Sequence, residues 1–374
     1  MNFNSRICIL AVAALASASL TAQSADTIVV GQSAPLSGAN AEIGNDIRNG
    51  ALAYFQKVNA AGGINGKTIE LVTLDDKNDR KTAGLNAATL VNENRVVALF
   101  GFASATLSLD AMELVAVKKV PFFAPFTGAD IMRKQSPYVF TVRASYEEEL
   151  EKILTFWSSL GLQRVTVIHY DDEVGNQNFK TVADFMQKAS KQSTGIKIKR
   201  NAAIEQATLD AIIKSDPQIV VLTTLYGPAA DIIRRLKEQN KPYMFSSLSF
   251  IGASQFAKAA GAEASGVSVA SVVPMPTNLS IPVVKECDEA IKKLPNAQLS
   301  FTSLESCIAA KVLVEGMRRV VGAQGVTRES LYKGLQGLGN YDAGGYVVSF
   351  GPGARHGSHF VDLSVITKSG AFKS

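Results

Sequence analysis

Short apolar runs alternate with helical patterns along most of the chain, most clearly over residues 96–128. Residues 96–100 are apolar on both faces, which is typical of a parallel strand buried between layers of helices. A break at residues 101–106 precedes a helical pattern, and a second apolar run at residues 120–124 ends in a turn that contains proline and glycine. The segment therefore predicts two consecutive strand–turn–helix units.

The same alternation continues in two blocks on either side of residue 143. Predicted strands lie at residues 27–30, 69–74, 96–100, 120–124 and 138–142 in the first block, at 165–168, 196–199, 219–222, 243–245 and 266–273 in the second, and at 346–350 and 361–366 near the end. Strands that alternate with helices indicate parallel sheets, so we predict an α/β fold with two doubly wound lobes. Three late helices, at residues 283–294, 301–321 and 328–338, are expected to return to the first lobe.

The first 24 residues have the features of a signal peptide that is removed on export. One arginine supplies a positive charge, residues 7–20 are apolar and rich in alanine, and Ala22 and Ser24 fit a small-x-small cleavage signal. The apolar run is too short to span a membrane, and no later stretch reaches spanning length. We expect a mature, exported and soluble protein that begins near Ala25.

Charge and length restrict the classes of partner and fold. The formal net charge of +5 falls to +4 without residues 1–24, because that segment contains one basic and no acidic residue. Basic residues are scattered among acidic ones, so the sequence predicts no nucleic-acid partner. About 350 mature residues exceed a single ordinary core and indicate two domains.

Two cysteines remain after export, Cys287 and Cys307, and both lie in predicted helices. The helices are consecutive and joined by a short turn around Pro295, so they are expected to pack as antiparallel neighbours. The cysteines lie 8 and 12 residues from Pro295, at roughly comparable heights. An exported protein permits a disulfide, yet two free buried thiols fit the sequence equally well.

The turns that follow the two central apolar runs contain the first candidates for a ligand site. In open parallel sheets, ligands bind just beyond the carboxyl ends of the strands. Hydroxyl groups and backbone N–H groups at a helix N-terminus favour a carboxylate or a phosphate there. These features single out Ser104, Ala105, Thr106, Phe126 and Thr127. An alternative is that the hydroxyl groups of residues 104 and 106 only cap the helix.

Catalytic and metal-binding patterns are scarce. The chain contains no Gly-x-Ser-x-Gly elbow, Gly-x-Gly-x-x-Gly motif after a strand or Walker sequence, so no nucleophile or nucleotide cofactor is predicted. The three histidines are His169, His356 and His359. The last two lie three residues apart without a third ligand nearby in sequence, so we predict no metal site. His169, with Asp171 or Asp172, leaves a cleft hydrolase as a remote alternative.

Two glycine-containing motifs resemble those of a known family. Residues 59–66 (NAAGGING) with the strand at 69–76, and residues 35–38 (PLSG) with Gly44 and Gly50, are similar to the signature of the branched-chain amino-acid-binding family. These are type I periplasmic solute-binding proteins of ABC transporters. The resemblance implies two lobes joined by three crossover strands, a small-molecule ligand, an ABC permease as partner, and a monomer.

The resemblance also implies where the lobes begin and end. The crossovers are expected near residues 142–145, 272–276 and 346–351. Lobe one is expected at residues 25–143 with 275–347, and lobe two at residues 144–274 with 348–374. A ligand would be captured between the lobes, and the crossovers would act as hinges when the lobes close.

The resemblance assigns roles to individual residues. In the family, hydroxyl and N–H groups at the third and fourth strand ends of lobe one bind the ligand carboxylate, and residues 104–106, 126 and 127 match these positions. The match for the side-chain pocket is Ile43, just before the glycine of the first turn. In lobe two, Val174 replaces the usual aromatic residue, and the usual acid is absent around Ser249. Tyr226 remains as an aromatic candidate on lobe two, and Phe102, Phe126 and Phe250 could add apolar or stacking surface.

The implied function is a non-enzymatic solute-binding protein that delivers a small carboxylate-bearing or amino-acid-like solute to an ABC importer. Because a buried ammonium without a carboxylate partner is costly, we expect a deaminated acid to bind more tightly than the matching amino acid. An acid at residues 171–173 that turned into the cleft would restore amino-acid binding. A ligand-sensing lobe that works with a membrane signalling partner is the alternative within the binding class.

Overall fold

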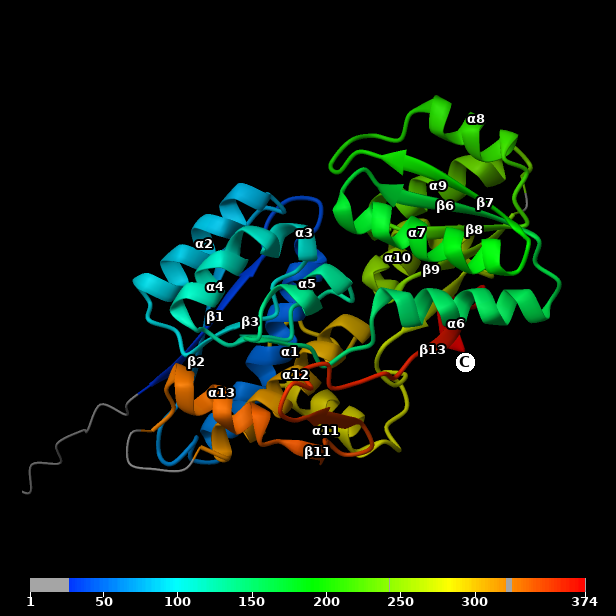
Figure 1. The fold of residues 1–374 in the computed structure, drawn as a ribbon. Helices are drawn as coiled ribbons and strands as arrows, with labels where there is room; N and C mark the ends of the chain where they lie inside the picture. Colours follow the sequence, from blue (N-terminus) through cyan, green and yellow to red (C-terminus); the bar gives the residue numbers. More distant parts are fainter. Residues whose placement is uncertain (1–26, 242, 321–324, 374) are drawn as a thin grey trace, which may run out of the picture.

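The computed structural model describes residues 27–241, 243–320 and 325–373. It contains two α/β lobes that lie side by side (Figure 1). The predicted signal peptide, residues 1–24, lies outside the described residues. None of the helices in the described ranges combines the length and the hydrophobicity that crossing a bilayer requires.

The described part of lobe one is built around a five-stranded parallel sheet in the order β2-β1-β3-β4-β5. Its strands are β1 (Ile28–Ala34), β2 (Ile69–Asp75), β3 (Ala98–Phe100), β4 (Phe122–Phe123) and β5 (Val139–Phe140). Its helices are α1 (Ala41–Ala60), α2 (Arg80–Asn92), α3 (Ala105–Ser108), η1 (Leu109–Ala111), α4 (Met112–Lys118), α5 (Asp130–Gln135), α11 (Pro282–Ile291), α12 (Phe301–Arg318) and α13 (Arg328–Gln336). A separate hairpin pairs β11 (Gly339–Asp342) with β12 (Val347–Phe350).

The described part of lobe two has a seven-stranded sheet in the order β14-β13-β10-β9-β8-β6-β7. Its strands are β6 (Arg164–Tyr170), β7 (Gln192–Ile198), β8 (Ile219–Thr223), β9 (Met244–Ser247), β10 (Ser268–Ser271), β13 (Asp362–Ile366) and β14 (Phe372–Lys373). Its helices are α6 (Tyr146–Ser159), α7 (Glu173–Lys188), α8 (Gln206–Lys214), α9 (Tyr226–Glu238), η2 (Ser249–Ile251), α10 (Ala253–Ala260) and η3 (Gly261–Ala264). The last two strands join antiparallel, and the others run parallel. The two-lobed α/β fold predicted from the hydrophobic pattern is confirmed.

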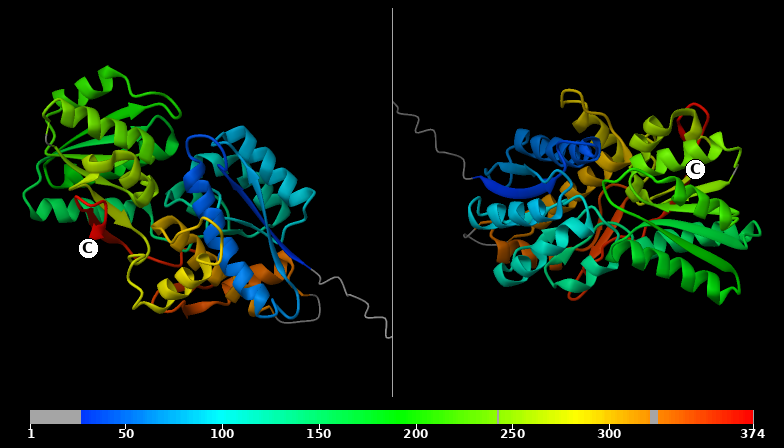
Figure 2. Two further views of the ribbon diagram at one scale, coloured as in Figure 1. Left: turned by 180° about the vertical axis from the view of Figure 1, so that it is seen from behind. Right: turned by 90° about the horizontal axis from the view of Figure 1, so that it is seen from above.

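The late helices return to lobe one, where α12 lies against α1 (Figure 2). Gly50 permits the close approach, since an added Cβ would lie 2.1 Å from the carbonyl oxygen of Ser303. The Ser306 hydroxyl donates to the carbonyl oxygen of Ile47 at 2.5 Å. Segments that are 259 residues apart in the sequence therefore complete one core.

Short elements account for most differences from the expected pattern. The helix expected after residue 106 is divided into α3, η1 and α4, and neither α5, α10 nor β11 was predicted. A periodic pattern needs roughly 11 residues or more to be recognised, and these segments are shorter than that.

Tyr346 connects the predicted crossovers. Its hydroxyl oxygen lies 2.8 Å from the carbonyl oxygens of both Val142 and Val272, and each of these residues lies at or beside a different predicted crossover. β12 pairs with β11, so the predicted lobe limit at 347/348 would divide a strand, and we propose that the third crossing follows residue 350. We propose to keep the other two limits, 143/144 and 274/275.

A disulfide joins Cys287 of α11 to Cys307 of α12, with the two Cα atoms 6.1 Å apart. Both side chains are buried in the core of lobe one. Of the two alternatives that the sequence left open, the structure therefore contains the disulfide.

We expect the variant Cys287→Ala/Cys307→Ala to lose about 2 to 3 kcal/mol of free energy of unfolding, because the bond closes a loop in the unfolded chain between residues 20 positions apart. Urea denaturation of the variant and of wild type measures the loss, and wild type with reductant is the matched control. Two reactive thiols in unfolded, unreduced wild type would contradict the bond.

Candidate ligand-binding site

A small cavity lies between the lobes. Its lining comes from both lobes: Ser104, Ala105 and Thr127 from lobe one, and Tyr146, Tyr170, Val174, Gly175, Asn178, Arg200, Thr223 and Phe250 from lobe two. Wider openings flank it, one beside α5 and α7 and the other beside the turn before α8. The described residues that line the cavity between the lobes include one basic side chain and no acidic one.

The lobe-one wall of the cavity is the turn after β3. Ser104 precedes α3, but its hydroxyl makes no capping bond to the N–H groups of this described turn. The alternative role as a helix cap is therefore not observed for Ser104, and this residue lines the cavity. α3 has only four residues, so individual N–H groups rather than a helix dipole would contact an anion. The Thr127 hydroxyl donates to Tyr146 Oη at 3.2 Å.

The lobe-two wall follows the carboxyl ends of β6, β7 and β8. α6 begins with a capping box between Ser145 and Glu148, which fixes the start of the helix that carries Tyr146. Asp172 caps the N-terminus of α7, and its carboxylate accepts the N–H of Gly175 at 2.8 Å. A Cβ at Gly175 would lie 2.0 Å from the carbonyl oxygen of Tyr170, so glycine is required there. These contacts hold the first turns of α6 and α7 at the cavity.

Arg200 brings a positive charge to the cavity from the end of β7. Its Nε donates to Asp172 Oδ2 at 2.8 Å, and its guanidinium lies 4.0 Å from the ring centre of Tyr170. Its Nη2 lies 3.4 Å from the hydroxyl oxygen of Thr106, which belongs to lobe one. Nη1 is buried and has no hydrogen-bond partner among the described residues.

Four of the ten predicted site residues line the cavity, and they are Ser104, Ala105, Thr127 and Val174. Phe250, named from the sequence only as possible apolar surface, lines it as well. The other six lie near the cleft or behind it: Ile43, Phe102, Thr106, Phe126, Tyr226 and Ser249. Ile43 is buried against Gly252, and Phe102 packs edge-on against Phe122. The Thr106 hydroxyl donates across the cleft to Asp172 at 3.2 Å.

Several polar contacts bridge the lobes around the cavity. The Tyr226 hydroxyl donates to the carbonyl oxygen of Ala39. Three more pairs are Lys258 with Glu42 at 2.7 Å, Gln255 with Asp46 at 2.8 Å, and Asn78 with Asn201 at 3.0 Å. Residues of both lobes therefore touch at the rim, and the structure is a closed arrangement.

Ser249 belongs to a buried charge cluster behind the cavity. Arg143 Nη2 donates to Ser249 Oγ and lies 2.9 Å from Glu149 Oε1, while Nη1 lies 3.2 Å from Glu305 Oε1. The Ser249 N–H and hydroxyl donate to Glu149 at 2.7 and 2.9 Å. The Phe126 ring centre lies 5.4 Å from the Arg143 guanidinium. Arg143 therefore contacts both Ser249 and Phe126, and neither residue is part of the described cavity lining.

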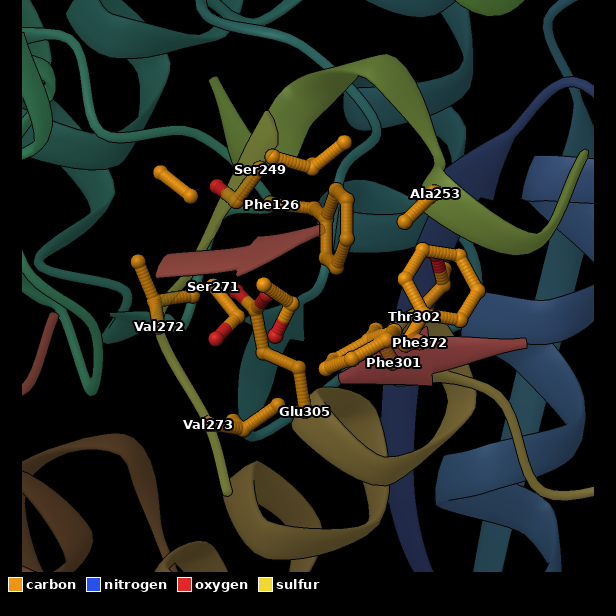
Figure 3. Close-up of a pocket in the computed structure, with 13 residues that line it drawn as sticks. Phe126, Ser249, Ala253, Ser271, Val272, Val273, Phe301, Thr302, Glu305 and Phe372 are labelled. Atoms are coloured by element: carbon orange, nitrogen blue, oxygen red, sulfur yellow. The ribbon is translucent and has the colours of Figure 1, made fainter. Parts of the chain in front are cut away.

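The same cluster borders a second small cavity, beside the second predicted crossover (Figure 3). Burial raises the pKa of Glu305 to about 7, because the attraction of Arg143 does not offset the loss of hydration. Burial lowers the pKa of Arg143, but the carboxylates of Glu305 and Glu149 outweigh it and raise that pKa above its ordinary value. The cluster is electrically balanced when Glu305 holds a proton.

The histidines do not assemble a catalytic site. His169 is absent from the described cavity lining; its ring stacks on Phe179 with the centroids 5.6 Å apart, and burial lowers its pKa. Asp171 forms an ion pair with Lys197 at 2.8 Å, and His169 Nδ1 lies 3.0 Å from the carbonyl oxygen of Tyr170. This arrangement gives the hydrolase alternative no support. Among the described residues, no three His, Cys, Asp or Glu side chains come together as a metal site.

Six lining residues escaped prediction: Tyr146, Tyr170, Gly175, Asn178, Arg200 and Thr223. Tyr170, Arg200 and Thr223 lie at or just beyond the ends of β6, β7 and β8. The rule that ligands bind beyond the carboxyl ends of strands would have found them, had it been applied to both lobes.

The fold and the cavity define a two-lobed solute-binding protein. A family described as periplasmic binding protein matches residues 27–371, so the chain belongs to this family. Leu/Ile/Val-binding protein homolog 7 of Brucella abortus is 26% identical over 333 residues, which cover 84% of this chain and 82% of that protein. The branched-chain amino-acid-binding, type I periplasmic class that the sequence motifs resemble is confirmed.

Two solved structures share the whole architecture. A possible leucine/isoleucine/valine-binding protein from Rhodopirellula baltica has a TM-score of 0.89 and 27% identity, over 94% of this chain and 97% of that one. A substrate-binding periplasmic protein from Ralstonia solanacearum has a TM-score of 0.86 and 31% identity, over 92% of this chain and 99% of that one.

Proposed function

We propose that this protein captures a small carboxylate-bearing solute between its lobes in the periplasm and delivers it to the permease of an ABC importer. The observation that supports this best is the cavity between the lobes, whose lining combines hydroxyl groups, aromatic rings and one arginine. An enclosed site with a few convergent polar groups is typical of small-molecule binding. Solute-binding proteins of this family are not enzymes, and membership supports the same role here.

The chemistry of the lining favours an acid over an amino acid. None of the described lining residues carries a carboxylate that could pair with an ammonium group. Asp172, the nearest acid of the α7 turn, is already bonded to Arg200 and to the N–H of Gly175. An ammonium buried without a partner costs on the order of a few kcal/mol.

We expect a deaminated acid, such as a branched 2-oxo acid or an aromatic acid, to bind about a hundredfold more tightly than the matching amino acid. Thermal-shift screening of paired amino acids and oxo acids, followed by calorimetry on the hits, measures this preference. In small-angle scattering we expect the free protein to be more open than the closed arrangement of the structure, and the best hit to make it more compact, with the crossovers acting as hinges. Micromolar binding of leucine or valine with silent oxo acids would contradict the preference.

A further inference from the structure

We propose that Arg200 is a carboxylate-binding residue contributed by lobe two, so that one anionic head group is held by both lobes at once. The proposal rests on the solute-binding function above and specifies the chemistry of its ligand. The lobe-one partner is the turn that carries Ser104 and Ala105.

The position of Arg200 relative to that turn is the first observation. Its Nη2 lies 3.4 Å from Thr106 Oγ1, and Thr106 follows Ser104 by only two positions. Arg200, Ser104 and Ala105 border the same cavity. The guanidinium and the lobe-one donors therefore converge on one small region.

The second observation is that some N–H groups of the Arg200 guanidinium lack a close acceptor among the described residues. Asp172 occupies only the Nε side of the guanidinium, at 2.8 Å. Nη1 is buried with no partner among the described residues, and the Nη2 contact with Thr106 is long. A buried donor without an acceptor is unfavourable, and a carboxylate accepts two parallel N–H bonds from a guanidinium.

The third observation is that the arginine is held in place before any ligand arrives. Tyr170 lies under the guanidinium at 4.0 Å, and Asp172 is itself fixed by capping α7. A planar guanidinium group that is already oriented loses little conformational freedom when it binds an anion. The same charge repels an ammonium group, which reinforces selection of acids over amino acids.

Three single variants separate this role from a structural one. Arg200→Gln removes the guanidinium group. Asp172→Asn removes the competing carboxylate but keeps an oxygen that can accept the N–H of Gly175. Lys258→Gln is the matched control. Lys258 is a lobe-two cation that also bridges to lobe one, through Glu42, but lies outside the described cavity lining.

The probes are acetate, benzoate and 4-methyl-2-oxopentanoate, each beside its neutral amide, and the readout is calorimetry on the full mature chain. We expect wild type to bind at least one of the acids. Arg200→Gln should weaken that acid at least 30-fold and change the amide less than threefold. Asp172→Asn should bind the acid several-fold more tightly, and Lys258→Gln should change acid and amide by the same factor.

Four results would overturn the proposal. They are no binding of any of the three acids, an unchanged acid affinity in Arg200→Gln, equal weakening of acid and amide in that variant, and weakening by Asp172→Asn as large as that by Arg200→Gln. The last two would mean that the arginine only clamps the lobes. If one of these results is found but an amino acid still makes the wild-type particle more compact in scattering, the solute-binding function is supported and the role of Arg200 is refuted.

Discussion

Arg143→Met should lower the free energy of unfolding by about 3 to 5 kcal/mol, because it leaves two buried carboxylates without their cation. The side chains of Arg143 and Glu149 are 1% and 0% exposed, and the guanidinium lies 2.9 Å from Glu149 and 3.2 Å from Glu305. Methionine keeps much of the volume between the rings of Phe126 and Tyr146, so the loss reports mainly on charge. Chemical denaturation monitored by fluorescence measures it.

The matched control is Arg80→Met, which removes an ion pair with Asp110 in which both side chains are nearly half exposed. Exposed pairs contribute about 1 kcal/mol or less. The double variant Arg143→Met/Glu149→Gln should recover part of the stability, since one uncompensated charge is gone. Equal losses for Arg143→Met and Arg80→Met would show that the cluster does not stabilise the hinge.

Glu305→Gln should be about 3 kcal/mol more stable than wild type at pH 8, and only about 1 kcal/mol more stable at pH 5. Burial raises the pKa of Glu305 to about 7 in the folded protein, from an ordinary value of 4.5. Between these two values the folded state binds more protons than the unfolded chain. Wild type therefore loses stability as the pH rises through this window, and glutamine removes that loss.

Urea denaturation at pH 5, 6, 7 and 8 gives the difference between the two proteins. Burial also raises the pKa of Asp46 and Asp76, but both residues are present in both proteins and cancel in the difference. Glu329→Gln, on the exposed surface beside Lys333, should keep the wild-type pH profile. Parallel profiles for wild type and Glu305→Gln would refute the assignment.

Local patterns in the chain predicted the fold and part of the site. Apolar runs of strand length, alternating with helical periods, are set by neighbours within a few residues, so they predicted the two α/β blocks. The strand-end rule predicted Ser104, Ala105 and Thr127 at the candidate site, because these positions follow directly from chain direction in a parallel sheet. The family resemblance alone predicted Val174.

Contacts between segments far apart in the sequence determine the parts of the candidate site that local patterns did not predict. Arg200 follows two lysines in an ordinary basic stretch, and only the pairing of β7 beside β6 brings it over Tyr170 and next to Thr106 of the other lobe. Ser249 matched a ligand position, but Arg143 and Glu149, both more than 90 residues away, occupy its polar atoms. The partner of a polar side chain depends on which segments meet in space, and local periodicity does not contain that information.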